Sequence, residues 1–266
     1  MLKEQKLYLD WKGSYTEIAH KRYEPYLRHF RQFTKGKRVE RVTLHDIAKW
    51  QHTISLKYAR ANVYYAVVII KNFFRYLRAQ DYRVVDPWLI KLPKYITRKR
   101  HAVTKEEFEQ LTRYLSEREY KPLKVKTVIC LLWDTGIRVR ELVELNLADM
   151  DTVRRRAVIK NRKNKQYRTV RWGIRTNKIL VQYLGIRLTI STAEPLFIFR
   201  GKRVTTRSVE RWVRTTSESV DLRSITPHLL RHGWAVYRRK KKADLAFLQK
   251  GMGHQSPNST MVYIQY

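Results

Sequence analysis

The chain has 266 residues, 43% of them hydrophobic, which is enough for two modest cores and makes two domains the expected arrangement. Its 57 Lys and Arg against 23 Asp and Glu give a formal net charge of +34, which favours a nucleic acid partner and, less well, an anionic membrane surface. The single Cys130 excludes an intramolecular disulfide, and the sequence has neither a signal peptide nor an apolar stretch of roughly 20 residues, so we expect a cytoplasmic, nucleoid-associated protein without membrane contact.

Residues 1–93 are predicted to form a helical domain. Apolar residues in Thr16–Phe33 recur at near-helical spacing, although Pro25 within this run is expected to kink or break the helix. Thr43 and Asp46 are spaced as an N-cap pair that begins the next helix. A long helix is then expected to begin between residues 55 and 60 and to end at residue 79, because its apolar side chains repeat at helical spacing.

A linker is predicted at residues 94–103. Pro93 ends the first domain because residues before a proline avoid the helical region. Thr104 and Glu107 then match a capping box, which begins a second domain at residues 104–266.

The second domain is predicted to combine helices with a small antiparallel sheet. Its first helix should end near residue 116, and a second, from 123 to 134, should be ended by Gly136. β-rich runs on either side of residues 161–166 predict a hairpin; nine of the 18 residues from 154 to 171 are basic and none is acidic. The later elements expected are a helix near 178–183, a strand at 196–199 and a helix at 206–217.

Histidine, arginine and tyrosine side chains recur at short separations near the C-terminal end. His228 and Arg231 are three residues apart, so on a helix they share one face. His254 follows, and Tyr263 lies nine residues later, on what is expected to be a final short helix. Arg offers planar donors for two phosphate oxygens, and His can move a proton near neutral pH. A phenol, with a pKa of about 10, needs such help to attack phosphorus. The group therefore predicts a phosphate site with a tyrosine nucleophile.

The pattern of His-x-x-Arg, then Gly-His, then a tyrosine resembles the second box of the tyrosine recombinase, or phage integrase, family. The family's first box, Thr-Gly-x-Arg-x-x-Glu-Leu, is similar to residues 135–142, and a Lys-rich segment lies between the boxes, where the family has a lysine in a β-turn. The resemblance covers nearly the whole chain and is closest to small Xer-like recombinases. It implies a multi-domain protein, with an all-α, SAM-like core-binding domain that grips DNA and a mixed α+β catalytic domain that is mostly helical.

The resemblance also implies a reaction. A site-specific recombinase of this family cuts and rejoins DNA strands through a covalent 3′-phosphotyrosyl intermediate, without a metal or nucleotide cofactor. Its partner is double-stranded DNA at specific sites, on which a homotetramer, a dimer per site, works through a Holliday junction. The alternatives are a topoisomerase-like enzyme that cuts and reseals one strand, a DNA-binding protein with an inactive site and, on charge alone, a ribosome-associated protein. The sequence does not separate integration, excision and dimer resolution.

By resemblance, Arg138 and Arg231 clamp the non-bridging oxygens of the scissile phosphate and stabilise the transition state. An ion pair between Arg138 and Glu141, three residues apart, is the alternative, and it is compatible with that role. His228 is assigned to assist proton removal from the tyrosine, and His254 to donate to a phosphate oxygen.

The departing 5′-oxygen needs a proton, for which Lys163 is the candidate. Placing Arg168 at the family's arginine after the turn favours Lys163. Lys160 and Lys165 compete, because the turn lacks the family's usual glycines and its register is open.

Tyr263 is the predicted nucleophile because of its distance from His254, although Tyr266 follows one turn later. His232 is expected to serve packing or support. Gly233 departs from the Thr or Ser often seen at its position in the family.

Overall fold

The computed structural model describes residues 1–14, 19–94, 101–160, 167–254 and 256–266. The chain divides into two units, Met1–Arg98 and Lys99–Tyr266, and each has its own hydrophobic core. The expected linker at 94–103 falls largely on residues 95–100, which lie outside the described residues.

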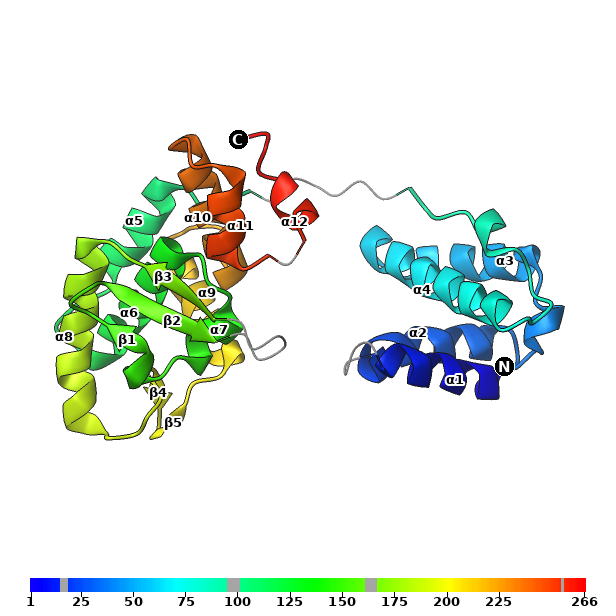
Figure 1. Ribbon diagram of the computed structural model, residues 1–266, viewed down its shortest axis with the longest axis horizontal. Coiled ribbons are helices and arrows are strands. Elements are labelled where there is room, and N and C mark those ends of the chain that lie inside the picture. The colour runs from blue at the N-terminus through cyan, green and yellow to red at the C-terminus, as the bar shows by residue number, and fades with distance from the viewer. Residues whose placement is uncertain (15–18, 95–100, 161–166, 255) are drawn as a thin grey trace. The chain divides into compact units, whose positions relative to one another are not determined.

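The first unit is a helical bundle built around its longest helix, α4 (Figure 1). Helices α1, α2 and α3 each pack against α4, and the apolar stripe of α4 is buried between them. This arrangement confirms the predicted helical character of the N-terminal part. The elements are α1 (Leu2–Gly13), α2 (Ala19–Phe33), η1 (Val39–Arg41), α3 (Leu44–Ser55), α4 (Arg60–Ala79) and η2 (Pro87–Leu89).

Pro25 was expected to kink or break its helix; it lies inside α2, which is not broken. Leu27 and Phe30, which follow it on the same helix, are almost completely buried. Their packing offsets a local cost of about 3 kcal/mol for an interior proline. The predicted cap of the next helix is confirmed as a capping box between Thr43 and Asp46.

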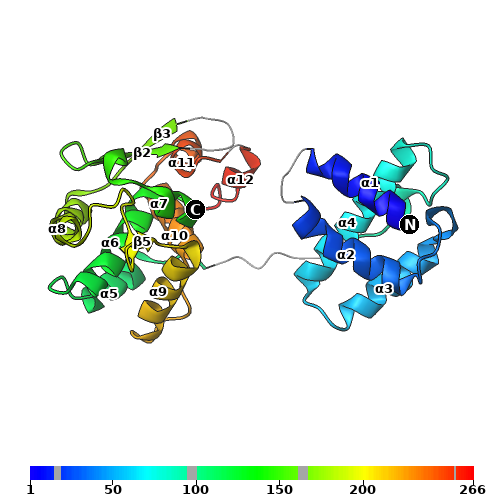
Figure 2. The same cartoon turned by 90° about the horizontal axis from the view of Figure 1, so that it is seen from below.

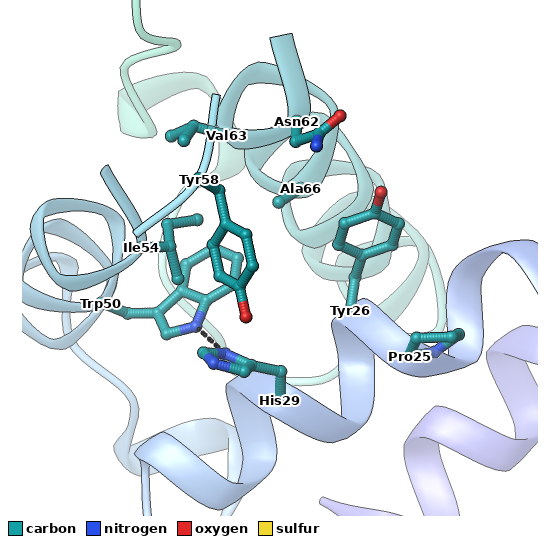
Figure 3. Close-up of a pocket in the computed structure, with 9 residues that line it drawn as sticks. All are labelled: Pro25, Tyr26, His29, Trp50, Ile54, Tyr58, Asn62, Val63 and Ala66. Atoms are coloured by element: carbon teal, nitrogen blue, oxygen red, sulfur yellow. Dashed lines mark hydrogen bonds between the residues drawn. The ribbon is translucent and has the colours of Figure 1, made fainter. Parts of the chain in front are cut away.

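A pocket of about 280 Å³ opens between α2, α3 and α4 (Figure 3). The rings of Tyr26 and Tyr58 line it, together with His29 and Trp50. Trp50 is 1% exposed, and its Nε1–H donates to His29 Nδ1 at 3.0 Å. The hydrogen bond satisfies the buried indole N–H and ties α3 to α2.

The second unit is organised around α6, against which α5, α7, α8, α9, α10 and strand β3 pack (Figures 1 and 2). Between Leu123 and Thr135, α6 is buried at nearly every position, and beside its apolar side chains it buries Lys124 and Lys126. The helices are α5 (Lys105–Tyr114), α6 (Tyr120–Thr135), α7 (Val139–Glu144), η3 (Leu147–Asp149), α8 (Ile174–Ile190), α9 (Thr206–Glu218), α10 (Pro227–Lys240), α11 (Leu245–Met252) and α12 (Asn258–Met261).

The sheet of this unit is small and antiparallel, as predicted. Strands β1 (Met150–Asp151), β2 (Arg156–Lys160) and β3 (Tyr167–Arg171) pair in the order β1-β2-β3, and Ile159 lies opposite Arg168. The turn of the predicted hairpin, residues 161–166, lies outside the described residues. A separate pair joins β4 (Ile198–Phe199) to β5 (Lys202–Arg203).

Two elements differ from the sequence-based expectation. Helix α8 extends well beyond residues 178–183, because the fully buried Arg187 in its last turn donates to the carbonyls of Ala193 and Pro195 and holds the following chain against the helix. The strand expected at 196–199 is reduced to β4, since Leu196 N–H donates to the carbonyl of Leu145 instead of a sheet partner.

Candidate active site

The turn between α6 and α7 places Arg138 at the start of a helix. Gly136 ends α6 in the left-handed conformation, at φ 63°. A Cβ there would lie 2.6 Å from the Trp234 ring of α10, so the site requires glycine for conformation and for space. The capping of α7 joins the backbone N–H of Arg138 to Glu141 Oε2 at 2.7 Å.

The C-terminal end of α11 holds the arginines of the site. The last carbonyls of a helix have no partner within it and carry partial negative charge, so they attract cations. Here consecutive carbonyls each accept from a different arginine. The pairs are Gly251 with Arg168 Nε at 3.2 Å, Met252 with Arg231 Nη2 at 2.7 Å, and Gly253 with Arg138 Nη2 at 3.0 Å.

Glu141 is the carboxylate that balances this cluster. Arg168 donates to it from both terminal nitrogens, at 3.0 and 2.7 Å, and Arg138 Nη1 donates to it at 3.1 Å. Burial alone would raise the pKa of Glu141, but the hydrogen bonds and charges of Arg168 and Arg138 lower it overall. Arg138 therefore forms the ion pair with Glu141 and also donates to the carbonyl at the end of α11.

Arg231 is the most deeply placed of these arginines, at 4% exposure. Nη1 donates to the carbonyl of Gly136 at 2.6 Å, so Arg231 joins the α6–α7 turn to the end of α11. Burial first, and then the charge of Arg138, lower the pKa of Arg231 to about 10, and its guanidinium stays charged at neutral pH. A buried, charged group facing other cations is a site prepared for an anion.

His254 lies directly after this helix end. Its Nδ1 lies 2.8 Å from Oγ1 of the buried Thr260. Burial first, and then the charges of Arg231, Arg138 and Arg168, lower the pKa of His254 to about 4. A smaller effect from His228 shows that both histidines belong to this neighbourhood. His254 is therefore neutral at physiological pH.

This lowered pKa predicts a specific pH dependence of stability. Between pH 6.5 and about 4, the unfolded chain binds a proton at His254 that the folded chain rejects, so stability falls as the pH drops through this window. We expect the free energy of unfolding of the wild type to decrease relative to that of His254→Asn, which keeps a polar atom near Nδ1, as the pH is lowered from 7 to 4.5. Urea unfolding at each pH measures the difference, and parallel curves would contradict the prediction.

Tyr263 lies beside α10 rather than on a helix of its own. Helix α12 ends at Met261, so the expectation of a helical Tyr263 was wrong; the N–H of Tyr263 donates to the carbonyl of Thr260 in the turn that follows. Its hydroxyl lies 3.1 Å from Nδ1 of His232. His228, which the family resemblance assigned to assist proton removal from the tyrosine, is exposed on α10.

The lysine candidates divide between described and undescribed parts of the chain. Lys163 and Lys165 fall within 161–166, outside the described residues. Lys160 is described, and its Nζ lies 2.7 Å from Asp149 Oδ1, a contact that raises the pKa of this lysine. In this conformation Lys160 is held at the base of the hairpin.

The sequence analysis predicted the pair of Arg138 with Glu141, but it missed the contacts of Arg168 with Glu141 and Gly251 and the contact of His232 with Tyr263. Arg168 and the buried Val170 are two residues apart, so they share the inward face of β3. This shared face is the signal that could have placed Arg168 in the site. The structure also explains the glycine at position 233, because a Cβ there would lie 2.5 Å from the carbonyl oxygen of Val103.

The chain belongs to the phage integrase family, whose model matches residues 101–266. It is 33% identical over 212 residues to the tyrosine recombinase XerC of Thermodesulfovibrio yellowstonii, covering 73% of this chain and 67% of that protein. It is 31% identical over 255 residues to XerC of Roseiflexus castenholzii, covering 91% and 81%. Among solved structures, a lambda integrase tetramer bound to a Holliday junction matches with a TM-score of 0.75 and 18% identity, covering 96% of this chain and 77% of that one.

The protein is thus a tyrosine site-specific recombinase related to XerC, an enzyme that exchanges DNA strands. The comparisons confirm the predicted family and the predicted combination of a helical N-terminal part with a catalytic domain carrying a small sheet. Of the helices described, none combines the length and the apolar character needed to cross a bilayer. Within the described ranges, no group of three or more His, Cys, Asp or Glu side chains is arranged to hold a metal ion.

Proposed function

We propose that the pocket of Arg138, Arg231 and His254 binds the scissile phosphate of double-stranded DNA and that Tyr263 attacks it, forming a 3′-phosphotyrosyl link and releasing a 5′-hydroxyl. The observation that carries this proposal is the convergence of separate arginines on the end of α11, next to His254. The charge of Arg231 partly opposes the rise that burial causes in the pKa of Tyr263, which supports a role for this tyrosine near the arginines.

The arginines keep donors for a phosphate. A guanidinium has five N–H donors, and the described contacts of Arg231 use two of its nitrogens. The Arg138 side chain is 44% exposed, so it reaches a ligand from solvent while Glu141 and Gly253 hold it. Charge that develops on the phosphoryl oxygens would be stabilised by both, and losing one such placed donor costs roughly 10²–10³ in rate.

His254 fits the role of a neutral donor. With Nδ1 accepting from the hydroxyl of Thr260, the neutral ring carries its proton on Nε2 and can donate it to a phosphate oxygen. His228, on the face of α10 that carries Arg231, is proposed as a further member of the pocket.

The proton for the departing 5′-oxygen is assigned to the β2–β3 hairpin. We keep Lys163 as the general acid, with Lys165 as its competitor. The contact of Lys160 with Asp149 supports this choice, because it holds that lysine by a carboxylate in the described conformation.

Assembly and DNA binding extend the proposal to the whole chain. We propose that residues 1–93 form a core DNA-binding domain, joined by the linker at 94–103 to the catalytic domain at 104–266, and that four copies act on two DNA sites, a dimer per site, at the nucleoid. The net charge of +34 and the lambda integrase tetramer on a Holliday junction support this arrangement. Binding should weaken by about 0.9 log unit per log unit of salt for each phosphate neutralised.

A two-site plasmid assay tests this function. Supercoiled plasmids carrying paired copies of the DNA that flanks the gene are incubated with the protein, and the products are analysed by restriction and topology. Deletion or inversion products are expected. If the plasmid is only relaxed, the protein acts as a strand-resealing enzyme; if it is bound without any product, the site is inactive, and either result contradicts strand exchange.

A further inference from the structure

The hydroxyl of Tyr263 is held by an imidazole of α10. Tyr263 is 5% exposed, so its ring is largely shielded from water. Its Oη lies 3.1 Å from Nδ1 of His232, and the two ring centroids are 5.3 Å apart with an interplanar angle of 43°. The contact is made at the reactive atom of the tyrosine, not only along its ring.

The position of His232 follows from the register of α10. The preceding residue, Arg231, points to the turn after α6 and to the end of α11. One residue later the helix has turned by about 100°, which directs His232 to the segment after α12. Tyr266 also packs edge-on against this imidazole, with centroids 6.2 Å apart at 81°. His232 therefore contacts two tyrosine rings, and α10 carries Arg231 and the histidine partner of Tyr263 on adjacent residues.

We propose that His232 accepts the phenolic proton of Tyr263 during DNA cleavage and returns it during rejoining. This inference rests on the proposed function, in which Tyr263 is the nucleophile. In cleavage, the bond from Oη to phosphorus forms, the bond from phosphorus to the 5′-oxygen breaks, and the proton passes from Oη to Nδ1. The 5′-oxygen leaves with a proton from the hairpin lysine. In rejoining, the 5′-hydroxyl returns its proton to the hairpin lysine and attacks phosphorus, the bond from phosphorus to Oη breaks, and Nδ1 gives its proton back to Oη.

Tyr263 needs a proton acceptor because its buried position makes its hydroxyl harder to ionise. Burial raises the pKa of Tyr263, and the opposing charge of Arg231 does not cancel that effect. A phenol with a raised pKa attacks slowly unless a base takes its proton in the same step. His232 meets the geometric requirement for that base, because its nitrogen lies within hydrogen-bond distance of the proton it would take.

Two substitutions separate proton transfer from packing. His232→Phe keeps an aromatic ring in contact with both tyrosines, whereas His232→Asn keeps a polar atom near Nδ1 that can orient the hydroxyl without accepting its proton. Single-turnover formation of the covalent adduct is measured on nicked duplexes drawn from the DNA that flanks the gene. Both variants should form adduct about 10²–10⁴-fold more slowly than the wild type. A near-normal rate in either variant would overturn the proposal.

A second measurement excludes a merely structural defect. 3,5-Difluorotyrosine in place of Tyr263 gives a more acidic phenol that depends less on a base. It should raise the rate of the His232 variants by at least tenfold more than it raises that of the wild type. Equal effects in both backgrounds would contradict the role of His232. Wild-type adduct is required before either comparison; if the wild type forms none on DNA that it binds, the proposed function has failed, not the assignment of His232.

Discussion

Tyr263→Phe is expected to abolish the covalent protein–DNA adduct while leaving DNA binding intact. The substitution removes the hydroxyl that attacks phosphorus, and loss of a nucleophile lowers the rate by on the order of 10⁶-fold. The fold should change little, because the ring stays in its buried position and the variant loses one hydrogen bond, to His232, worth about 0.5–1.5 kcal/mol. A denaturing gel detects the adduct, and a mobility shift assay measures binding.

Tyr266→Phe is the matched control for this experiment. Tyr266 contacts the same histidine through its ring, but the hydroxyl lost in the control is not the one that meets Nδ1. The control should retain adduct formation. If Tyr263→Phe still forms adduct, or if Tyr266→Phe abolishes it, the nucleophile has been assigned to the wrong tyrosine.

Glu141→Gln is expected to destabilise the catalytic unit by about 3–5 kcal/mol, the cost of removing one partner from a buried ion pair. The Glu141 and Arg168 side chains are each 12% exposed, so water cannot replace the lost charge. The neutral amide would leave Arg138, Arg168 and Arg231 gathered at the end of α11 without a balancing carboxylate. Hydrogen exchange of peptides from α6 and α10 at increasing urea measures the stability of this unit separately from the first.

Glu218→Gln provides the comparison for a surface charge. Glu218 pairs with Arg214 at 3.8 Å, and both side chains are more than half exposed, so its loss should cost no more than about 1 kcal/mol. Equal stability of the two variants would show that Glu141 does not balance the cluster.

The sequence predicted the parts of this fold that depend on local chemistry. Capping boxes at Thr43 and Thr104 begin helices where their spacing places them, and Gly136 ends α6 because its left-handed conformation disfavours other residues. The inward and outward alternation of β2 and β3 likewise follows from the period of a strand. Pro25 misled the prediction because the packing of a helix in the bundle outweighs the local cost of a proline.

The site was only partly predictable, because its organisation is set by contacts between distant residues. Arg168 reaches Glu141 across 27 positions, and Arg138 reaches Gly253 across 115. Backbone carbonyls accept hydrogen bonds from the arginines, and because every residue has a carbonyl, the sequence does not show which ones will do so. His232 was predicted to serve packing or support because its spacing from His228 shows its position on the helix but not which residue it contacts. The chain turns after α12, and this turn brings Tyr263 to His232.

Identifying the residue that becomes joined to DNA would show directly whether Tyr263 is the nucleophile. Wild-type protein is incubated with nicked duplexes from the DNA that flanks its gene, the denatured adduct is digested with nuclease and trypsin, and the modified peptide is sequenced by mass spectrometry. A nucleotide attached through a 3′-phosphate to Tyr263 is expected. A nucleotide on any other residue, or no adduct on DNA that the protein demonstrably binds, would contradict this assignment.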